Sequence, residues 1–453
     1  MTNKSTSESW VDPKGDSWTS LIDEVCAGNW VNPDTGTVLE AAFNCVEIDE
    51  QLDNRIEALV RKVMPADSYV VVSDENTYDV LGKAVTDAMA AVPGIKATSL
   101  VLDHPHADVQ EVASLREKTR NAQALIAVGT GTINDLCKYT TANDGRAYSI
   151  FGTAPSMNGY TSTTASITLD NGMKTTQAAH AANGVFIDLN ISAQAPQYLV
   201  AAGLGDSLCR STAQIDWFLS HRLLNTKYFT AAYVLQKADE VALLQRSGML
   251  GQRDIDAIGY LYRIMILTGL GISTTGMSHP GSMGEHQISH WIDSFAGDKH
   301  PGTIHGQQVG VSSITMAKLQ HQILSSETAP QIKPTVVDEA GIKSRYPAAA
   351  IDGCLTAARN KAFNPEQAAA FNKKIEQLWP TLRTELLEMA VPAETLAAHL
   401  SAAGGGVTAE EVGIDKQMYR DAVRYALEIR DRYSMLDLAA DMGVLDDFVE
   451  EHC

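Results

Sequence analysis

Cysteine is scarce and scattered in this sequence. The chain has 453 residues and six cysteines, none of them in a Cys-x-x-Cys pair: Cys26, Cys45, Cys137, Cys209, Cys354 and Cys453. In a chain of this length, such spacing argues against a disulfide framework and against the usual cysteine zinc sites. It is typical of free thiols in a reducing compartment, so we expect a cytoplasmic protein.

Positive charge is also in short supply. Thirty-five basic residues face fifty-five acidic ones, which gives a net charge of −20. This balance argues against nucleic acid or an anionic membrane as a partner, although a local basic pocket for a small anion is still compatible with it. Long apolar runs are missing as well. No stretch approaches the roughly 20 apolar residues of a membrane-spanning helix, and residues 1–8 lack a signal-peptide core.

What the sequence does contain is two kinds of periodicity. Up to about residue 190, β-branched runs at 69–72, 97–102 and 124–128 alternate with helical patterns at 77–91 and 109–119, and later strands are expected at 147–152, 165–169 and 184–188. This alternation predicts a parallel sheet with crossover helices. From about residue 196, 3.6-residue spacing predicts helices at 228–246, 254–270, 308–324, 365–389 and 415–433.

The fold class is therefore predicted as an α/β domain over residues 1–192 followed by an all-α domain over residues 193–453. A hydrophobic content of 45% is enough for two or three such domains. The first fifty or so residues are polar and irregular, and no role is assigned to them.

Histidine is arranged in a pattern that suggests a metal site. His286 and His290 are four residues apart, and His305 follows nineteen residues after His286. Residues i and i+4 share one face of a helix, and nineteen residues are about enough for a helix, a turn and the next helix start. With the carboxylate of Asp206, His286 and His305 would form a three-ligand catalytic site that leaves His290 for chemistry. The alternative is that these histidines are ordinary surface or hydrogen-bonded core residues.

A glycine turn follows the predicted strand at 124–128. Gly129, Gly131 and the apparent helix start at Thr132 could cradle a phosphate with free backbone N–H groups. The turn lacks the third glycine of G-x-G-x-x-G and is a weak signal alone. Earlier, Asp74 ends a predicted strand and could bind the ribose hydroxyls of an adenosine, or simply cap the next helix.

Five sequence blocks together resemble a known family. They are Gly129-Thr130-Gly131-Thr132-Ile133-Asn134-Asp135, Thr153-Ala154-Pro155-Ser156-Met157, Gly205-Asp206, Glu285-His286 with Ser289-His290, and His305-Gly306. In order and approximate spacing they resemble the sn-glycerol-1-phosphate dehydrogenase family, which is part of the iron-containing alcohol dehydrogenase, glycerol dehydrogenase and dehydroquinate synthase superfamily. The segment 429–438 also looks like that of bacterial members.

The resemblance implies a nucleotide-binding α/β domain, a helical domain and a site in the cleft between them. It implies NAD or NADP as cofactor, with NAD favoured by Asp74, and one divalent zinc, nickel or iron ion. The implied substrate is a small phosphate, dihydroxyacetone phosphate or sn-glycerol 1-phosphate, and we expect a homo-oligomer. For the cofactor, the resemblance implies ribose binding by Asp74, pyrophosphate binding by Gly129, Thr130, Gly131, Thr132 and Ile133, and contacts on the nicotinamide side by Thr153, Ala154, Pro155, Ser156 and Ser162. For the metal ion, it implies the ligands Asp206, His286 and His305. For the substrate, it implies contact and proton relay by His290, with Asn158 and Asp206 also in contact with the substrate.

The sequence departs from the family pattern at two informative positions. Asn158 stands where the family usually has Asp, and Arg210 stands where iron-dependent alcohol dehydrogenases carry an additional histidine ligand. Arg210 or Lys174 could bind the substrate phosphate, although a solvated loop lysine is the simpler interpretation of Lys174. Two other functions stay open at this point: a cyclising phosphate lyase like dehydroquinate synthase, and a nucleotide-binding homologue with altered catalysis.

Overall fold

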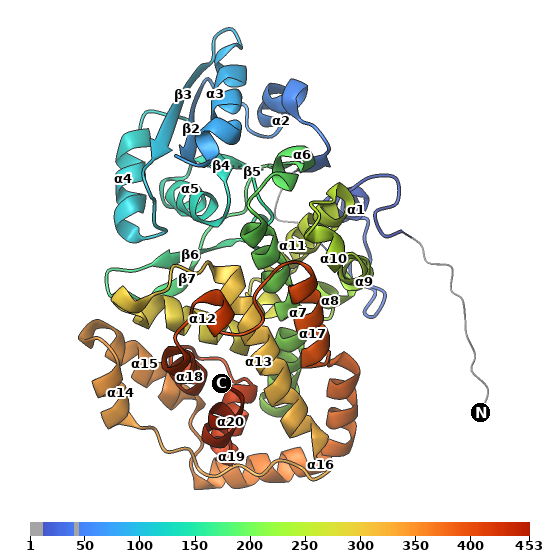
Figure 1. Cartoon of the computed structure of the whole chain (residues 1–453), viewed down its shortest axis with the longest axis vertical. Helices are drawn as coiled ribbons and strands as arrows, with labels where there is room; N and C mark the ends of the chain where they lie inside the picture. The colour runs from blue at the N-terminus through green and yellow to red at the C-terminus, as the bar shows by residue number, and fades with distance from the viewer. Residues whose placement is uncertain (1–11, 40–44) are drawn as a thin grey trace, which may run out of the picture.

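The computed structural model describes residues 12–39 and 45–453, and within them a six-stranded sheet forms the upper layer of the molecule (Figure 1). All neighbouring strands are parallel, in the order β1-β8-β5-β4-β2-β3. Their bounds are β1 Val46–Asp49, β2 Ser68–Asp74, β3 Lys96–Leu102, β4 Ala124–Gly129, β5 Ala147–Gly152 and β8 Val185–Asp188. The predicted parallel sheet is confirmed.

Helices form the crossover connections between these parallel strands. They are α2 Ile56–Val63, α3 Lys83–Ala90, α4 Val109–Thr119 and α5 Gly131–Asp144, with a π-helical turn at Tyr78–Gly82 before α3. Strand β4 is buried along its whole length, as expected for a central strand covered on both faces. Because β4 and β5 end in register at Gly129 and Gly152, the loops that follow them leave the sheet side by side.

Three strands differ from the prediction: β6 (Thr164–Thr168) lies outside the sheet, and β1 and β7 (Lys174–Ala178) were not predicted. The segment predicted as a strand at 165–169 forms β6, which pairs not with the sheet but with β7 in a separate antiparallel hairpin. Strand β1 was not predicted, because it has only four residues and its partner β8 lies far along the chain. Short polar strands give little periodicity of their own, and tertiary pairing decides them.

The helical part begins with α6 (Leu189–Ala193) and the 28-residue α7 (Gln197–Leu224). Helix α7 packs along α13 (His305–Ser325), and their backbones touch at glycines. A Cβ added at Gly205 would lie 2.4 Å from the carbonyl oxygen of Gly306, and one added at Gly306 would lie 2.1 Å from that of Ala202. Helix α12 (Gly284–Phe295) packs on both.

The remaining helices surround this trio (Figure 1). They are α8 Ala231–Val234, α9 Lys237–Gln245, α10 Ser247–Leu250, α11 Ile255–Thr275, α14 Glu339–Arg345, α15 Ala348–Lys361, α16 Pro365–Met389, α17 Ala393–Ala402, α18 Lys416–Tyr425, α19 Met435–Met442 and α20 Leu445–His452, with 3₁₀ turns at Asp53–Arg55, His279–Gly281, Gly297–Lys299, Glu410–Val412 and Ala426–Glu428. Buried residues of α14 to α16 and α18 to α20 form a second hydrophobic core with parts of α7, α12 and α13. The helix predicted at 365–389 is confirmed, whereas those predicted at 228–246 and 415–433 are each broken into shorter pieces.

Helix α11 differs from the expectation that no stretch of the chain approaches the length and apolar character of a membrane-spanning helix. Among the described residues it is the one helix long and apolar enough to cross a membrane, with a mean hydropathy of 1.4 over its most apolar window. Within the structure, 89% of that window is buried. The N-terminal segment, with α1 (Ser20–Cys26), covers it: buried Arg263 of α11 pairs with Asp239 and donates to the carbonyl oxygens of Pro13 and Trp18. The described part of the N-terminal segment, residues 12–39, therefore packs on the helical part.

Candidate active site

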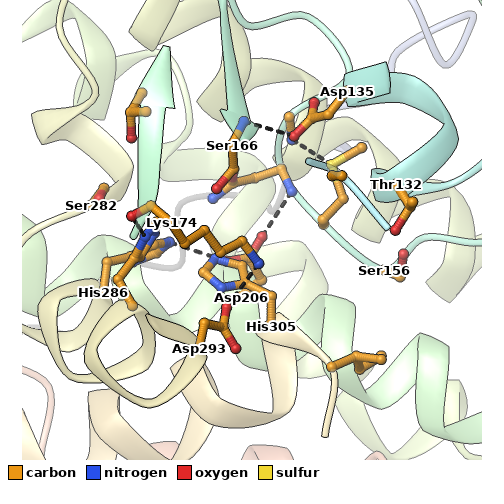
Figure 2. A pocket seen from close by; sticks show the side chains of 18 of the residues that line it. Thr132, Asp135, Ser156, Ser166, Lys174, Asp206, Ser282, His286, Asp293 and His305 are labelled. Carbon is orange, nitrogen blue, oxygen red and sulfur yellow. Dashed lines mark hydrogen bonds and ion pairs between the residues drawn. The ribbon is translucent and has the colours of Figure 1, made fainter. Parts of the chain in front are cut away.

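A cavity of about 680 Å³ lies between the carboxyl edge of the sheet and helices α7, α12 and α13 (Figure 2). Ten of the residues predicted from the sequence line it: Thr130, Gly131, Thr132, Ser156, Asn158, Ser162, Asp206, His286, His290 and His305. Gly129, Ile133, Thr153, Ala154 and Pro155 belong to the same two segments but are not in its wall. Figure 2 shows Thr132 and Ser156 on one side of the cavity and Lys174, Asp293 and the histidines on the other.

The first side of the cavity is suited to an anion. Helix α5 begins at Gly131 without a side-chain cap at Thr130, so the backbone N–H groups of its first turn have no partner of that kind. The N-terminus of a helix carries partial positive charge and binds phosphate groups readily. This is the geometry expected for the pyrophosphate of a dinucleotide.

The loop after β5 is held in place by a buried lysine that sequence reasoning missed. Lys138 is fully buried on α5, and its Nζ donates to the carbonyl oxygens of Gly159 (2.7 Å) and Thr164 (3.0 Å) and to Oγ of Ser162 (3.1 Å). Asp135, one turn earlier, accepts a hydrogen bond from the backbone N–H of Ser166. These contacts fix the loop between β5 and β6 against the start of α5.

On the other side, three helices bring the predicted metal ligands together. Oδ1 of Asp206 lies 3.5 Å from Nε2 of His286 and 3.8 Å from Nε2 of His305. A tetrahedral ion with bonds of about 2.0–2.2 Å would hold its ligand atoms about 3.4 Å apart. Asp206 is completely buried, and its Oδ1 has no hydrogen-bond partner. A buried carboxylate oxygen without a partner is costly unless a cation binds it, so this donor set fits a divalent ion.

In each of the two predicted metal ligands His286 and His305, a polar neighbour contacts the ring nitrogen that faces away from Asp206. Nδ1 of His286 lies 3.1 Å from Oε1 of the buried Glu285, and Nδ1 of His305 lies 3.1 Å from Oγ of Ser289. Such outer contacts fix which ring nitrogen faces a metal. Burial lowers the pKa of His305 to about 4, so its ring is neutral and its lone pair is available for an ion. Burial alone would also lower the pKa of His286, but the carboxylates of Asp206 and Glu285 raise it.

Cys209 lies close to the same ligands. Its Sγ belongs to a set, with Asp206 and His286, whose ligand atoms all lie within 4.8 Å of one another. Burial and the carboxylate of Glu285 raise the pKa of the Cys209 thiol well above its ordinary value. A protonated thiol is a weak ligand, and Cys209 directs its hydrogen to the carbonyl oxygen of Gly281 at 3.5 Å instead.

His290 lies between a guanidinium and a backbone carbonyl. Burial and the neighbouring Arg430 lower the pKa of His290 well below its ordinary value, so the ring is neutral. Nη2 of Arg430 lies 3.1 Å from Nδ1 of His290 and 3.5 Å from its Nε2, so the guanidinium lies over the face of the ring and not along the lone pair of one nitrogen. Nδ1 also lies 3.5 Å from the carbonyl oxygen of Lys174. A neutral imidazole keeps one N–H donor, and the proton relay predicted for His290 stays a prediction.

Comparison with known proteins places this geometry in a family. Residues 47–196 match the model of the iron-containing alcohol dehydrogenase family. Glycerol-1-phosphate dehydrogenase [NAD(P)+] from Bacillus velezensis is 28% identical over 386 residues, which cover 83% of this chain and 86% of that protein. The protein of the same name from Methanosarcina mazei is 30% identical over 283 residues, which cover 61% of this chain and 77% of that protein. The chain belongs to the glycerol-1-phosphate dehydrogenase family. The family predicted from the five sequence blocks is thereby confirmed.

Solved structures agree on the fold. Glycerol dehydrogenase from Schizosaccharomyces pombe superimposes with a TM-score of 0.60 at 16% identity, covering 91% of both chains. NADH-dependent butanol dehydrogenase A from Thermotoga maritima also gives 0.60, at 12% identity, covering 91% of this chain and 97% of that one. NAD(P) and a divalent metal ion fit this family.

Asn158 is the departure from the glycerol-1-phosphate dehydrogenase pattern that lies in the cavity. Its backbone N–H donates to Oδ2 of Asp206 at 2.8 Å, and this hydrogen bond joins the loop after β5 to helix α7. Its buried side-chain Nδ2 has no hydrogen-bond partner. An amide N–H₂ can only donate, so Asn158 offers a free donor to a substrate oxygen at a position where an aspartate would offer a charge.

The two basic residues predicted for the phosphate have different surroundings. Arg210 is not in the cavity wall and forms an ion pair with Glu240, so the prediction that it binds substrate phosphate is wrong. Lys174 on β7 does line the cavity, where its Nζ pairs with Asp293 at 2.8 Å. It is not the solvated loop lysine that was the simpler interpretation.

Asp74 lies outside the cavity at the end of β2. Its Oδ1 accepts hydrogen bonds from the backbone N–H groups of Asn76 (3.0 Å) and Thr77 (2.8 Å) and from the hydroxyl of Thr77. It thus makes the turn-capping contacts that were the alternative interpretation.

Proposed function

We propose that this protein is a metal-dependent dehydrogenase that transfers hydride between NAD(H) or NADP(H) and the pair sn-glycerol 1-phosphate and dihydroxyacetone phosphate. The observation that carries the proposal is the unpartnered Oδ1 of Asp206, which faces both His286 and His305 beside a helix N-terminus suited to a dinucleotide. The names of the relatives supply the substrate pair.

Asp206, His286 and His305 would hold the metal ion, which when bound would act as a Lewis acid on the carbonyl oxygen of the ketone. One carboxylate and two imidazoles suit zinc, nickel or iron(II). The unpaired Nδ2 of Asn158 would donate to a substrate oxygen, and the one N–H group of the neutral His290 ring would donate to another. The nicotinamide carries the hydride, and the residues orient the substrate and keep water out.

We further propose that NADH is preferred to NADPH. Asp74, Glu75 and Asp103 place three carboxylates at the carboxyl ends of β2 and β3, and ligand atoms of Glu75 and Asp103 lie within 4.8 Å of each other beside His104, which pairs with Glu75. A 2′-phosphate at that edge would meet negative charge. Comparing kcat/KM for NADH and NADPH tests this, and equal values would contradict it. A homo-oligomeric state and a cytoplasmic location stay predictions.

The central experiment is an absorbance assay with NADH, a divalent metal and dihydroxyacetone phosphate. We expect steady NADH oxidation that a chelator abolishes and that zinc, nickel or iron(II) restores. His286→Ala should remove turnover while leaving the thermal unfolding midpoint of the metal-free protein nearly unchanged. Phosphate release without net oxidation would favour the cyclising lyase, and cofactor binding without either reaction would favour a homologue that has lost catalysis. Normal activity in His286→Ala would contradict the metal assignment.

A further inference from the structure

Arg430 is a cation without a carboxylate partner among the described residues, and it lies directly behind the wall of the cavity: it contacts Thr176 and His290, which line the cavity, but is not itself a lining residue. It lies between the 3₁₀ turn Ala426–Glu428 and helix α19 and is half-buried. Its Nη2 lies 3.2 Å from Oγ1 of Thr176 and 3.1 Å from Nδ1 of His290. No carboxylate in the described parts of the chain pairs with it, and burial and the nearby Arg432 lower its pKa to about 9.

Two of the neighbouring basic residues are neutralised by carboxylates: Lys174 pairs with Asp293, and Arg345 pairs with Glu428. Arg432 donates to Ser278 and to the carbonyl oxygen of Ser282, and the charge of Glu285 raises its pKa against the effect of burial. Arg430 has no such carboxylate nearby, and a partly buried charge without a counter-ion is stabilised by an anion that binds beside it.

Two neutral hydrogen-bond donors lie beside this guanidinium. Nε and Nη1 of Arg430 make no hydrogen bond with a described residue. The hydroxyl of Thr176 accepts from Arg430, which leaves its own hydrogen free. The neutral ring of His290 lies against the guanidinium and keeps one N–H group that can donate. Thr176 and His290 both line the cavity, so an anion placed there would meet two neutral donors with the charge of Arg430 directly behind them.

The position relative to the metal ligands matches a short substrate. The ring of His290 is centred 6.1 Å from that of His286 and 5.5 Å from that of His305. This is one helical turn, and it is about the span of a three-carbon skeleton with its carbonyl at the metal ligands and its ester group at the far end. The helix N-terminus at Gly131 is on the opposite side and is left for the dinucleotide.

We propose that Arg430, with Thr176 and His290, binds the phosphate group of the substrate. The assignment rests on the proposed function for the identity of the substrate, and on the unpaired guanidinium for the anion site itself. Arg430 distinguishes a phosphorylated ketone from its unphosphorylated form, because only the former supplies the missing negative charge.

The test compares two substrates in Arg430→Met, Arg430→Lys and the wild type. The measured quantity is the ratio of kcat/KM for dihydroxyacetone phosphate to that for dihydroxyacetone, which lacks the phosphate. We expect the ratio to fall by about 100-fold or more in Arg430→Met, mainly through KM, because a charge-assisted contact to the substrate is lost. Arg430→Lys should give a ratio between those of Arg430→Met and the wild type, since lysine keeps the positive charge but lacks the planar guanidinium group with its several N–H donors. Arg420→Met serves as the matched control, because Arg420 contacts only Glu450 and the carbonyl of Cys453, and should leave the ratio unchanged.

An equal loss on both substrates, or an unchanged ratio, would overturn the assignment. Binding of inorganic phosphate, measured by calorimetry, separates this result from a failure of the proposed function. If the wild type does not turn over dihydroxyacetone phosphate but binds inorganic phosphate in a manner that Arg430→Met abolishes, the substrate assignment is wrong and the anion site stands. If the folded wild type binds no inorganic phosphate, the anion site is wrong.

Discussion

Replacing Gly306 with alanine should separate the metal ligands without unfolding the protein. The added Cβ would lie 2.1 Å from the carbonyl oxygen of Ala202 on α7, and ordinary contact begins at 3.4 Å, so α13 must move by about 1.3 Å at this point. His305 is the preceding residue and moves with the helix. Protein metal sites hold their bonds to within about 0.2 Å, so the imidazole would no longer reach an ion bound by Asp206 and His286.

The cost in stability is smaller than the cost in function. Overpacking of this kind costs about 1–3 kcal/mol. In a chain of this size that should lower Tm by no more than about 10 °C. Metal affinity, by contrast, should fall by at least about 100-fold, because one of three ligands is lost.

Metal titration below the Tm of the variant provides the assay, with a competing chelator to set the free metal concentration and NADH oxidation as the functional readout. Gly353→Ala is the matched control, since a Cβ at this helical position meets only Sδ of Met173 at 3.9 Å. The control should bind metal normally and be no less stable than the wild type. If Gly306→Ala bound metal as tightly as the control, the contact between α7 and α13 would not set the ligand geometry, and this reasoning would be refuted.

Three further predictions concern single residues around the site. Glu285→Gln should weaken metal binding about 10–100-fold, measured by chelator competition, because it removes the charge that orients His286; unchanged affinity would contradict that role. Burial and Glu285 raise the pKa of Asp216 to about 8, so the folded protein keeps a proton that the unfolded chain releases above about pH 4, and stability is lost as the pH rises through 8. In thermal unfolding of the metal-free protein, Asp216→Asn should therefore show a smaller fall in Tm between pH 5 and 8.5 than the wild type, and an equal fall would speak against the protonated carboxyl. Asn158→Asp should raise KM for dihydroxyacetone phosphate about tenfold, since it adds a second carboxylate beside Asp206 and the phosphate is anionic; steady-state kinetics giving the wild-type KM would count against it.

Local periodicity was enough to predict the sheet and the helix that carries His286 and His290. The spacing of four residues places two imidazoles on one face whatever the rest of the chain does. The prediction that His305 starts the next helix is also confirmed, because only a turn and a short 3₁₀ segment fit between the two. Strands β1 and β7 were missed because their pairing is decided by distant or polar partners, which leave no periodic pattern.

The parts of the site that the sequence did not reveal are the partners of its obvious residues. Asp206 and His305 each stand next to a glycine, and the contact between Gly205 and Gly306 explains why, but a single glycine beside a polar residue has many ordinary causes. Glu285 could have been found from its position beside His286. Arg430 could not, because nothing in its local sequence shows that it lacks a carboxylate partner among the described residues and contacts Thr176 and His290.

Helix α7 and the loop after β5 are joined at two adjacent points. A Cβ at Gly203 would lie 1.7 Å from the carbonyl oxygen of Pro155, and the backbone N–H of Asn158 is bonded to Asp206. The loop after β5 and the part of α7 that carries Asp206 therefore shift as a single body. If they bind the dinucleotide and the ion as proposed, occupancy of one should favour occupancy of the other, and because linkage is reciprocal, the ion would tighten the dinucleotide by the same factor as the dinucleotide tightens the ion.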